Sequence, residues 1–169
     1  MATKKYLIAG GASGITEEAT VDASPGAADS GKVPSLDTGG KLSTTMMPTG
    51  FGADTLSLTT GEALSAGDLV YIAAAGTVFK ADADAVGKPA MGFVLSSAGS
   101  GVSVTVYFGS GLITGLSSLT PGALYYLSST AGGIVTTAPT GTGKIQQQVG
   151  FAANASTLYF EPQMAILLI

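Results

Sequence analysis

The stretch VSVTVYF, residues 102–108, decides the fold class. Hydrophobic and hydroxyl-bearing residues alternate along it, and β-branched and aromatic residues favour extended backbone. Because successive side chains of a strand point to opposite faces, the three valines and Phe108 would share one face, while the serine, the threonine and Tyr107 take the other. The stretch therefore predicts a β-strand with one buried face.

Comparable short runs continue on both sides, from residue 55 to the C-terminus. They are rich in Val, Leu, Tyr, Phe and Thr, and clusters of Gly, Ser, Asp or Pro separate them about every 8 to 12 residues. This spacing is typical of an all-β fold, and we expect an antiparallel β-sandwich or barrel. The expected strands cover residues 55–59, 69–73, 77–81, 91–96, 102–108, 111–115, 123–127, 132–137, 146–151, 157–160 and 165–168.

Residues 1–50 have a different character. They contain Gly and Pro punctuation and scattered single hydrophobics, without a sustained helical or strand period. We expect them to form no core of their own and to be an extended, largely irregular arm, followed by a β-domain over residues 51–169. Only residues 17–19 and 62–64 look locally helical, so we expect little helix anywhere.

The composition restricts the chemistry. Charged residues make up 11% of the 169, against about 25% in a typical soluble domain, and the chain has no His, Cys, Trp or Arg. It therefore lacks the commonest general base and metal ligand, the thiolate nucleophile and the bidentate phosphate-binding side chain. With a net charge of −4, we expect no enzyme, no cofactor, and no nucleic-acid, membrane or small-molecule partner.

Three motifs imitate binding sites, and each lacks a required part. Residues 6–15 look like the first strand and glycine loop of a short-chain dehydrogenase, but Thr16 replaces the last glycine. Residues 26–32 match a phosphate-binding P-loop up to its lysine, after which Val33 stands where a hydroxyl residue must bind magnesium. Asp82 and Asp84 have the spacing of calcium ligands, without a third ligand or a closing glutamate.

The block GKVPSLDTGGKL, residues 31–42, followed by Met-Met-Pro at 46–48, resembles a segment of virion appendage proteins of tailed bacteriophages. Farther along, AGDLV at 66–70, KPAMGFV at 88–94, LTPG at 119–122 and YYL at 125–127 are similar to a module of phage head decoration proteins and fibres. The resemblance spans roughly residues 31 to 162.

This resemblance implies a capsid decoration, or cement, protein that is made in the host cytoplasm and binds the outer surface of the virion head. Its partners would be the major capsid protein and further copies of itself, as a homotrimer at three-fold positions. The N-terminal arm would lie along capsid subunits, with these apolar contacts: Val33, Leu36, Leu42, Met46, Met47 and Phe51.

Two alternatives stay open. The chain could be a component of a tail or head fibre whose β-domain binds host-surface carbohydrate through exposed tyrosines. A fibre usually needs a shaft, and the sequence contains no heptads, collagen-like triplets or long repeat from which to build one. For residues 1–50, the alternative to a contact arm is a disordered tail.

Overall fold

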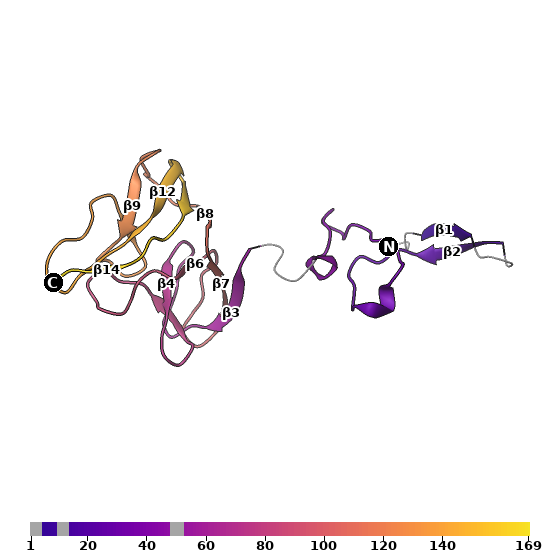
Figure 1. The fold of residues 1–169 in the computed structure, drawn as a ribbon, viewed down its shortest axis with the longest axis horizontal. Coiled ribbons are helices and arrows are strands. Elements are labelled where there is room, and N and C mark those ends of the chain that lie inside the picture. Colours follow the sequence, from indigo (N-terminus) through magenta and orange to yellow (C-terminus); the bar gives the residue numbers. More distant parts are fainter. Residues whose placement is uncertain (1–4, 10–13, 48–52) are drawn as a thin grey trace. The chain divides into compact units, whose positions relative to one another are not determined.

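The computed structural model describes residues 5–9, 14–47 and 53–169. The chain divides into two compact units, Met1–Gly52 (unit 1) and Ala53–Ile169 (unit 2) (Figure 1). Regular structure in the described residues consists of β-strands and two three-residue 3-10 helices, η2 (Ala27–Asp29) and η3 (Thr44–Met46). The prediction of an all-β protein is confirmed.

Unit 1 begins with a β-hairpin that the sequence analysis did not predict. Strand β1 (Lys5–Ala9) pairs antiparallel with β2 (Ile15–Ala19), and an ion pair of 2.8 Å joins Lys5 Nζ to Glu17 Oε2 across it. The expectation of a largely irregular arm is therefore wrong here, as is the helical reading of residues 17–19. A short isolated helix is disfavoured by its costly nucleation, whereas a hairpin satisfies backbone groups by local pairing.

The remainder of unit 1 is held by turns rather than by a core. The Val21 N–H donates to the Val33 carbonyl at 3.2 Å, and the Ser35 N–H donates to the Val21 carbonyl at 2.7 Å. Asp37 Oδ1 accepts hydrogen bonds from the backbone N–H groups of Gly39 and Lys41 at 2.8 and 2.9 Å. None of the unit 1 residues whose burial is described is buried, so the described part of this unit contains no core.

Unit 2 consists mainly of two five-stranded antiparallel sheets. The N-terminal sheet has the order β3-β7-β6-β4-β5, and the C-terminal sheet has the order β10-β9-β12-β13-β8. In Figure 1, β4, β6 and β7 (magenta) lie in one layer and β9 and β12 (orange to yellow) in the other. The N-terminal sheet contains β3 (Thr55–Thr59), β7 (Ser103–Phe108), β6 (Gly92–Val94), β4 (Leu69–Ile72) and β5 (Val78–Lys80).

The C-terminal half of unit 2 supplies the second sheet and a small ladder beside it. That sheet contains β10 (Ile134–Val135), β9 (Leu124–Leu127), β12 (Gln148–Asn154), β13 (Thr157–Phe160) and β8 (Gly111–Thr114). Two further strands, β11 (Ile145–Gln146) and β14 (Ile166–Leu167), pair with each other.

The main core lies between the two sheets. Leu69 and Phe93 from the N-terminal sheet and Leu158 and Phe160 from the C-terminal sheet belong to one buried cluster. The rings of Phe93 and Phe160 meet edge to face with centroids 5.2 Å apart. Because each sheet keeps its own hydrogen-bonded ladder while the side chains share one core, the architecture is a sandwich.

A second cluster covers the other face of the N-terminal sheet. Val104 and Val106 are buried there, as the alternation predicts, together with Leu64, whose backbone forms a bridge with Ala98. The helical reading of residues 62–64 is therefore wrong. One detail of the alternation differs, because Val102 precedes the strand and is 47% exposed. Tyr107 lies on the face opposite the buried valines, as the alternation predicts, and its ring stacks on Phe93 against the main core.

Two features, one in β12 and one in the residue directly before it, determine how this strand packs. The ladder between β12 and β9 shifts register between Gln148 and Gly150. A side chain at Gly150 would place its Cβ 1.9 Å from the Tyr159 carbonyl oxygen, so only glycine fits. Gln147, directly before β12, is buried. Its side-chain amide accepts from the Ala90 N–H at 2.8 Å and donates to the Ala90 carbonyl at 3.0 Å, as the backbone of a neighbouring strand would.

Candidate partner-binding surfaces

The arm residues predicted to contact a partner lie in the part of unit 1 that is held by turns. Val33, Leu36 and Leu42 are 44%, 52% and 40% exposed, which is high for large hydrophobic side chains. Met46 and Met47 are half-buried at the end of η3. Phe51 lies outside the described residues. Three of the six predicted contacts are therefore accessible to a partner chain.

Leu42 borders an open hollow of about 450 Å³ in unit 1. Five of its seven lining residues are polar or charged, and the Asp37 carboxylate among them already accepts two backbone hydrogen bonds. Leu42 is therefore the one large apolar side chain among the residues that line this water-accessible hollow. Its lining residues are Asp22, Ala23, Asp37, Lys41, Leu42, Ser43 and Thr44.

The β1–β2 hairpin adds two apolar side chains that sequence reasoning missed. Leu7 is 68% exposed and Ile15 is 74% exposed. Position 9 is two residues after Leu7 and lies opposite Ile15, so the Leu7 and Ile15 side chains belong to the same face of the hairpin. The sequence does carry a signal, two short apolar runs on either side of a glycine-rich stretch, but the same residues also match the pattern of a dehydrogenase loop.

The two nucleotide-binding motifs occupy local structure that differs from what those motifs require. Residues 15–19 form β2, where the dehydrogenase-like loop needs the start of a helix. In the P-loop-like segment, Lys32 Nζ lies 3.4 Å from Asp29 Oδ1, and Pro34 bridges to Val21. Neither segment leads into a helix whose N-terminus could receive a phosphate.

Unit 2 presents a row of hydrophobic side chains across the outer face of the C-terminal sheet. Leu112 on β8 lies opposite Tyr159 on β13, Tyr159 lies opposite Phe151 on β12, and Phe151 lies opposite Leu124 on β9. The row therefore crosses four adjacent strands in register. We call Leu112, Leu124, Phe151 and Tyr159 the outer row.

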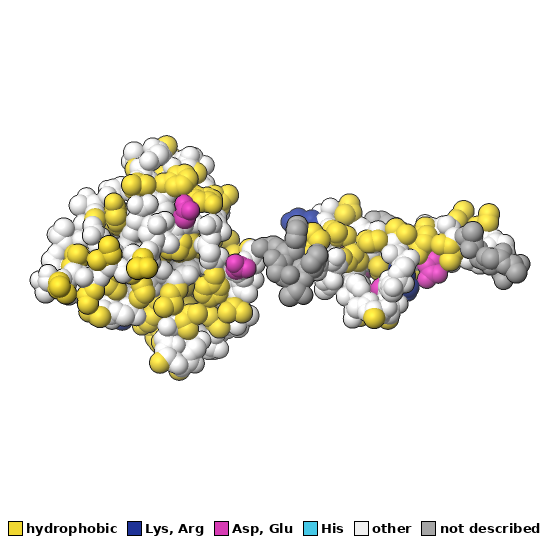
Figure 2. Space-filling model, viewed as in Figure 1, with side chains coloured by type: hydrophobic (Ala, Val, Ile, Leu, Met, Phe, Trp, Pro, Cys, Tyr) yellow, Lys and Arg dark blue, Asp and Glu magenta, His cyan; other side chains and the backbone are white. Residues whose placement is uncertain are grey.

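The outer row is accessible although it is apolar. Leu112, Leu124 and Phe151 are 52%, 46% and 38% exposed, Tyr159 is half-buried, and the Phe151 and Tyr159 rings lie 5.3 Å apart. None of the strands β8, β9, β10, β12 and β13 contains a charged residue. Figure 2 shows that the visible face of unit 2 carries mostly hydrophobic and uncharged polar side chains.

The exposed face of β3 and β7 in the other sheet has a different character. Ser57 and Ser103 share a hydrogen bond of 2.7 Å there, and Thr105 lies opposite Ser57. These hydroxyl residues lie on the face of β3 and β7 that also carries Tyr107, beyond the part of that face that packs against the main core. The outer row is therefore a local feature rather than a general result of the composition.

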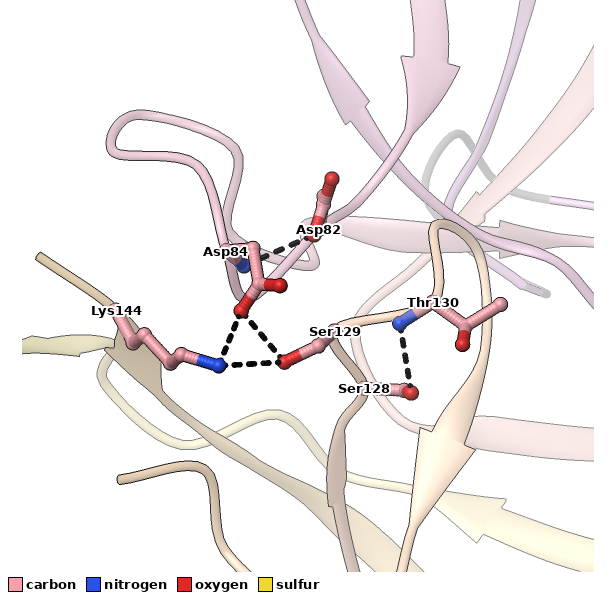
Figure 3. A network of polar contacts seen from close by, with 6 residues as sticks. All are labelled: Asp82, Asp84, Ser128, Ser129, Thr130 and Lys144. Carbon is pink, nitrogen blue, oxygen red and sulfur yellow. Dashed lines mark hydrogen bonds and ion pairs between the residues drawn. The ribbon is translucent and has the colours of Figure 1, made fainter. Parts of the chain in front are cut away.

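The charged groups of unit 2 include one small network (Figure 3). Asp84 Oδ1 accepts from Lys144 Nζ at 2.8 Å and from Ser129 Oγ at 2.6 Å, and these two hydrogen bonds hold the pKa of the Asp84 carboxyl below its usual value. Asp82 Oδ1 accepts from the Asp84 backbone N–H at 2.9 Å. Of these two aspartates, whose spacing alone imitates calcium ligands, Asp82 thus closes a turn and Asp84 forms an ion pair.

The hydrogen bonds of this network connect three segments of unit 2. Asp84 lies in the loop after β5, Ser129 in the turn after β9, and Lys144 directly before β11. Lys144 Nζ also donates to Ser129 Oγ at 3.4 Å, so each of the three side chains contacts the other two. Among the described residues, no three His, Cys, Asp or Glu side chains cluster as metal ligands would.

No protein-family model matches the sequence, and no curated protein matches it. Within residues 5–9, 14–47 and 53–169, no helix has the length and apolar character needed to cross a membrane.

Proposed function

We propose that this chain is a structural virion protein of a tailed bacteriophage, a capsid decoration protein that binds the outer surface of the head and bridges neighbouring capsid subunits. One observation carries the proposal beyond the sequence resemblance. Unit 1 has ordered turns and a hairpin but no buried residue among those whose burial is described, whereas unit 2 contains two buried clusters. A segment built in this way gains its burial from a partner.

The mechanism is binding energy alone. Burying a Val, Leu or Ile side chain completely contributes about 1.5–3 kcal/mol, and those of Val33, Leu36 and Leu42 are about half exposed. Each would therefore add about 1 kcal/mol when a capsid subunit covers it. One arm binds weakly on this basis, and many symmetric copies that bridge neighbouring subunits resist disassembly together.

Binding to heads that lack the protein tests the proposal. We expect the purified chain to sediment with such heads, and a variant with Val33→Asp, Leu36→Asp and Leu42→Asp to lose at least tenfold in affinity. The matched control is Leu56→Asp in β3, because Leu56 is 56% exposed but lies in unit 2. Equal binding by the triple variant and the control would contradict a role for the arm.

A reconstruction of decorated particles then locates the chain. Density across the shell at three-fold positions would support the decoration role, the major capsid protein as partner and the trimer that the resemblance implies. Density confined to the tail or to isolated vertices would favour the alternative, a fibre component whose β-domain binds carbohydrate.

A further inference from the structure

We propose that the outer row is a self-association surface, through which the C-terminal sheets of two copies of this chain pack face to face. The four side chains come from β8, β13, β12 and β9 and lie in register across the sheet. The residues between them along each strand, such as Ile113 and Leu158, point inward and are buried. The outer face therefore carries an apolar row, flanked by the Thr114–Thr157 and Tyr126–Gln148 pairs, and only the inner face of the sheet is covered within the chain.

The absence of charge from these strands favours an identical partner. A face that carries charges of one sign is repelled by a copy of itself, whereas an uncharged face meets its copy without that cost. No residue of β8, β9, β10, β12 or β13 is charged. Since the whole chain has a net charge of −4, two copies repel each other elsewhere and can approach most closely at this sheet.

The geometry fits an isologous contact. Two sheets stack about 10 Å apart when the side chains of the facing surfaces interdigitate. Under a two-fold axis, the Phe151 and Tyr159 rings at the middle of one row would lie against those of the other copy, with Leu112 and Leu124 at the two ends. Aromatic side chains at the centre of a contact are typical of interface hot spots.

The size of the face predicts a weak contact. Five strands at about 4.8 Å spacing, each about 13 Å long, give a face on the order of 300 Å². A standard interface buries about 800 Å² on each partner, so the pair should dissociate readily at low concentration. If the proposed function holds, copies anchored on a shell would have a high effective concentration, and this two-fold contact would join copies that belong to neighbouring trimers. The contact itself does not depend on that function.

Sedimentation equilibrium of the full chain, from about 10 μM to about 1 mM, tests the inference. We expect the weight-average mass to rise from the 16.6 kDa of one chain toward twice that value. Leu112→Glu and Leu124→Glu, which place a charge at either end of the row, should each raise the dissociation constant at least tenfold. Leu56→Glu is the matched control, since Leu56 is at least as exposed as Leu112 and Leu124 but lies on β3, and this variant should dimerise like the unmodified chain.

Amide NMR spectra over the same concentrations give a second measurement that also reports whether each variant is folded. Concentration-dependent shifts should gather on β8, β9, β12 and β13. A monomer at every concentration, a plateau at three copies, or equal loss of dimer in Leu56→Glu would overturn the inference. Shifts of the outer row on adding neutral oligosaccharide to a strictly monomeric chain would assign the row to a glycan instead. Because no capsid is present, failure here and failure of the proposed capsid binding are separate results.

Discussion

Replacing Gln147 by Met tests whether one buried amide holds the two halves of unit 2 together. Gln147 is 4% exposed, and its side chain makes two hydrogen bonds to the backbone of Ala90, which is also 4% exposed. It donates a third, at 3.0 Å, to the carbonyl of Gln163. Methionine keeps the length of the side chain but can replace none of these bonds.

The magnitude follows from the groups left without a partner. A buried donor or acceptor that loses its hydrogen bond costs about 1–3 kcal/mol, and Ala90 would have one of each. The Gln163 carbonyl belongs to an exposed residue, so water can replace the lost partner. Methionine also avoids the cost of removing an amide from water, which offsets about 1 kcal/mol of this loss of stability. These terms leave about 1–5 kcal/mol, and we expect the free energy of unfolding to fall by about 3 kcal/mol, the middle of that range.

Urea unfolding followed by far-UV circular dichroism is a suitable assay, because the chain has no tryptophan. With a slope of about 1–3 kcal/mol per molar urea, the midpoint should fall by about 1–3 M. Gln148→Met is the matched control, because this neighbouring glutamine is only half-buried. An unchanged midpoint for Gln147→Met, or an equal fall for both variants, would refute the reasoning.

Two further variants test the C-terminal sheet and the charged network. Gly150→Ala should destabilise unit 2 by more than about 3 kcal/mol or prevent folding, because the new Cβ would lie 1.9 Å from a backbone carbonyl oxygen. The control is Gly115→Ala, which should cost about 1–2 kcal/mol, because Gly115 has a φ of +81° but nothing lies within 4 Å of the added Cβ. Thermal melts compare the two variants. Asp84→Asn should lower the melting temperature slightly at neutral pH. Because the pKa of Asp84 is lowered in the folded chain, its contribution to the stability of the fold is complete above its ordinary pKa of 3.8 and disappears as the pH falls through the lowered pKa. A difference in melting temperature between the variant and the wild type that persists in acid would contradict this assignment.

Most of the strands could be predicted because their signal is local. Residues 55–59 and 157–160 alternate in polarity between turn-forming clusters, and both ranges are strands with those bounds. Residues 146–151 were expected as one strand, but the buried Gln147 separates β11 from β12. Nothing in the run Gln146-Gln147-Gln148 shows which side chain is buried, because the choice depends on the backbone of Ala90, far away in the sequence.

The candidate surfaces were harder to predict for the same reason. The exposure of Val33, Leu36 and Leu42 follows from the absence of a core in unit 1, which the irregular pattern of residues 1–50 does indicate. The outer row depends on the register between four strands that are separated by turns and loops, and a shift of one residue in any strand would break it. Alternation shows that a strand has two faces, but not which residues of other strands lie beside it.

The short strand β6 links the two buried clusters of unit 2. Phe93 belongs to the core between the sheets, and the next residue, Val94, belongs to the cluster on the opposite face. Leu69 and Val70 on the adjacent β4 divide in the same way. Separating β6 from its neighbours would therefore disrupt both clusters at once, so unit 2 should lose them in a single cooperative transition. The amides of β4 and β6 should accordingly be among the last to exchange with deuterium, opening only when the whole unit unfolds.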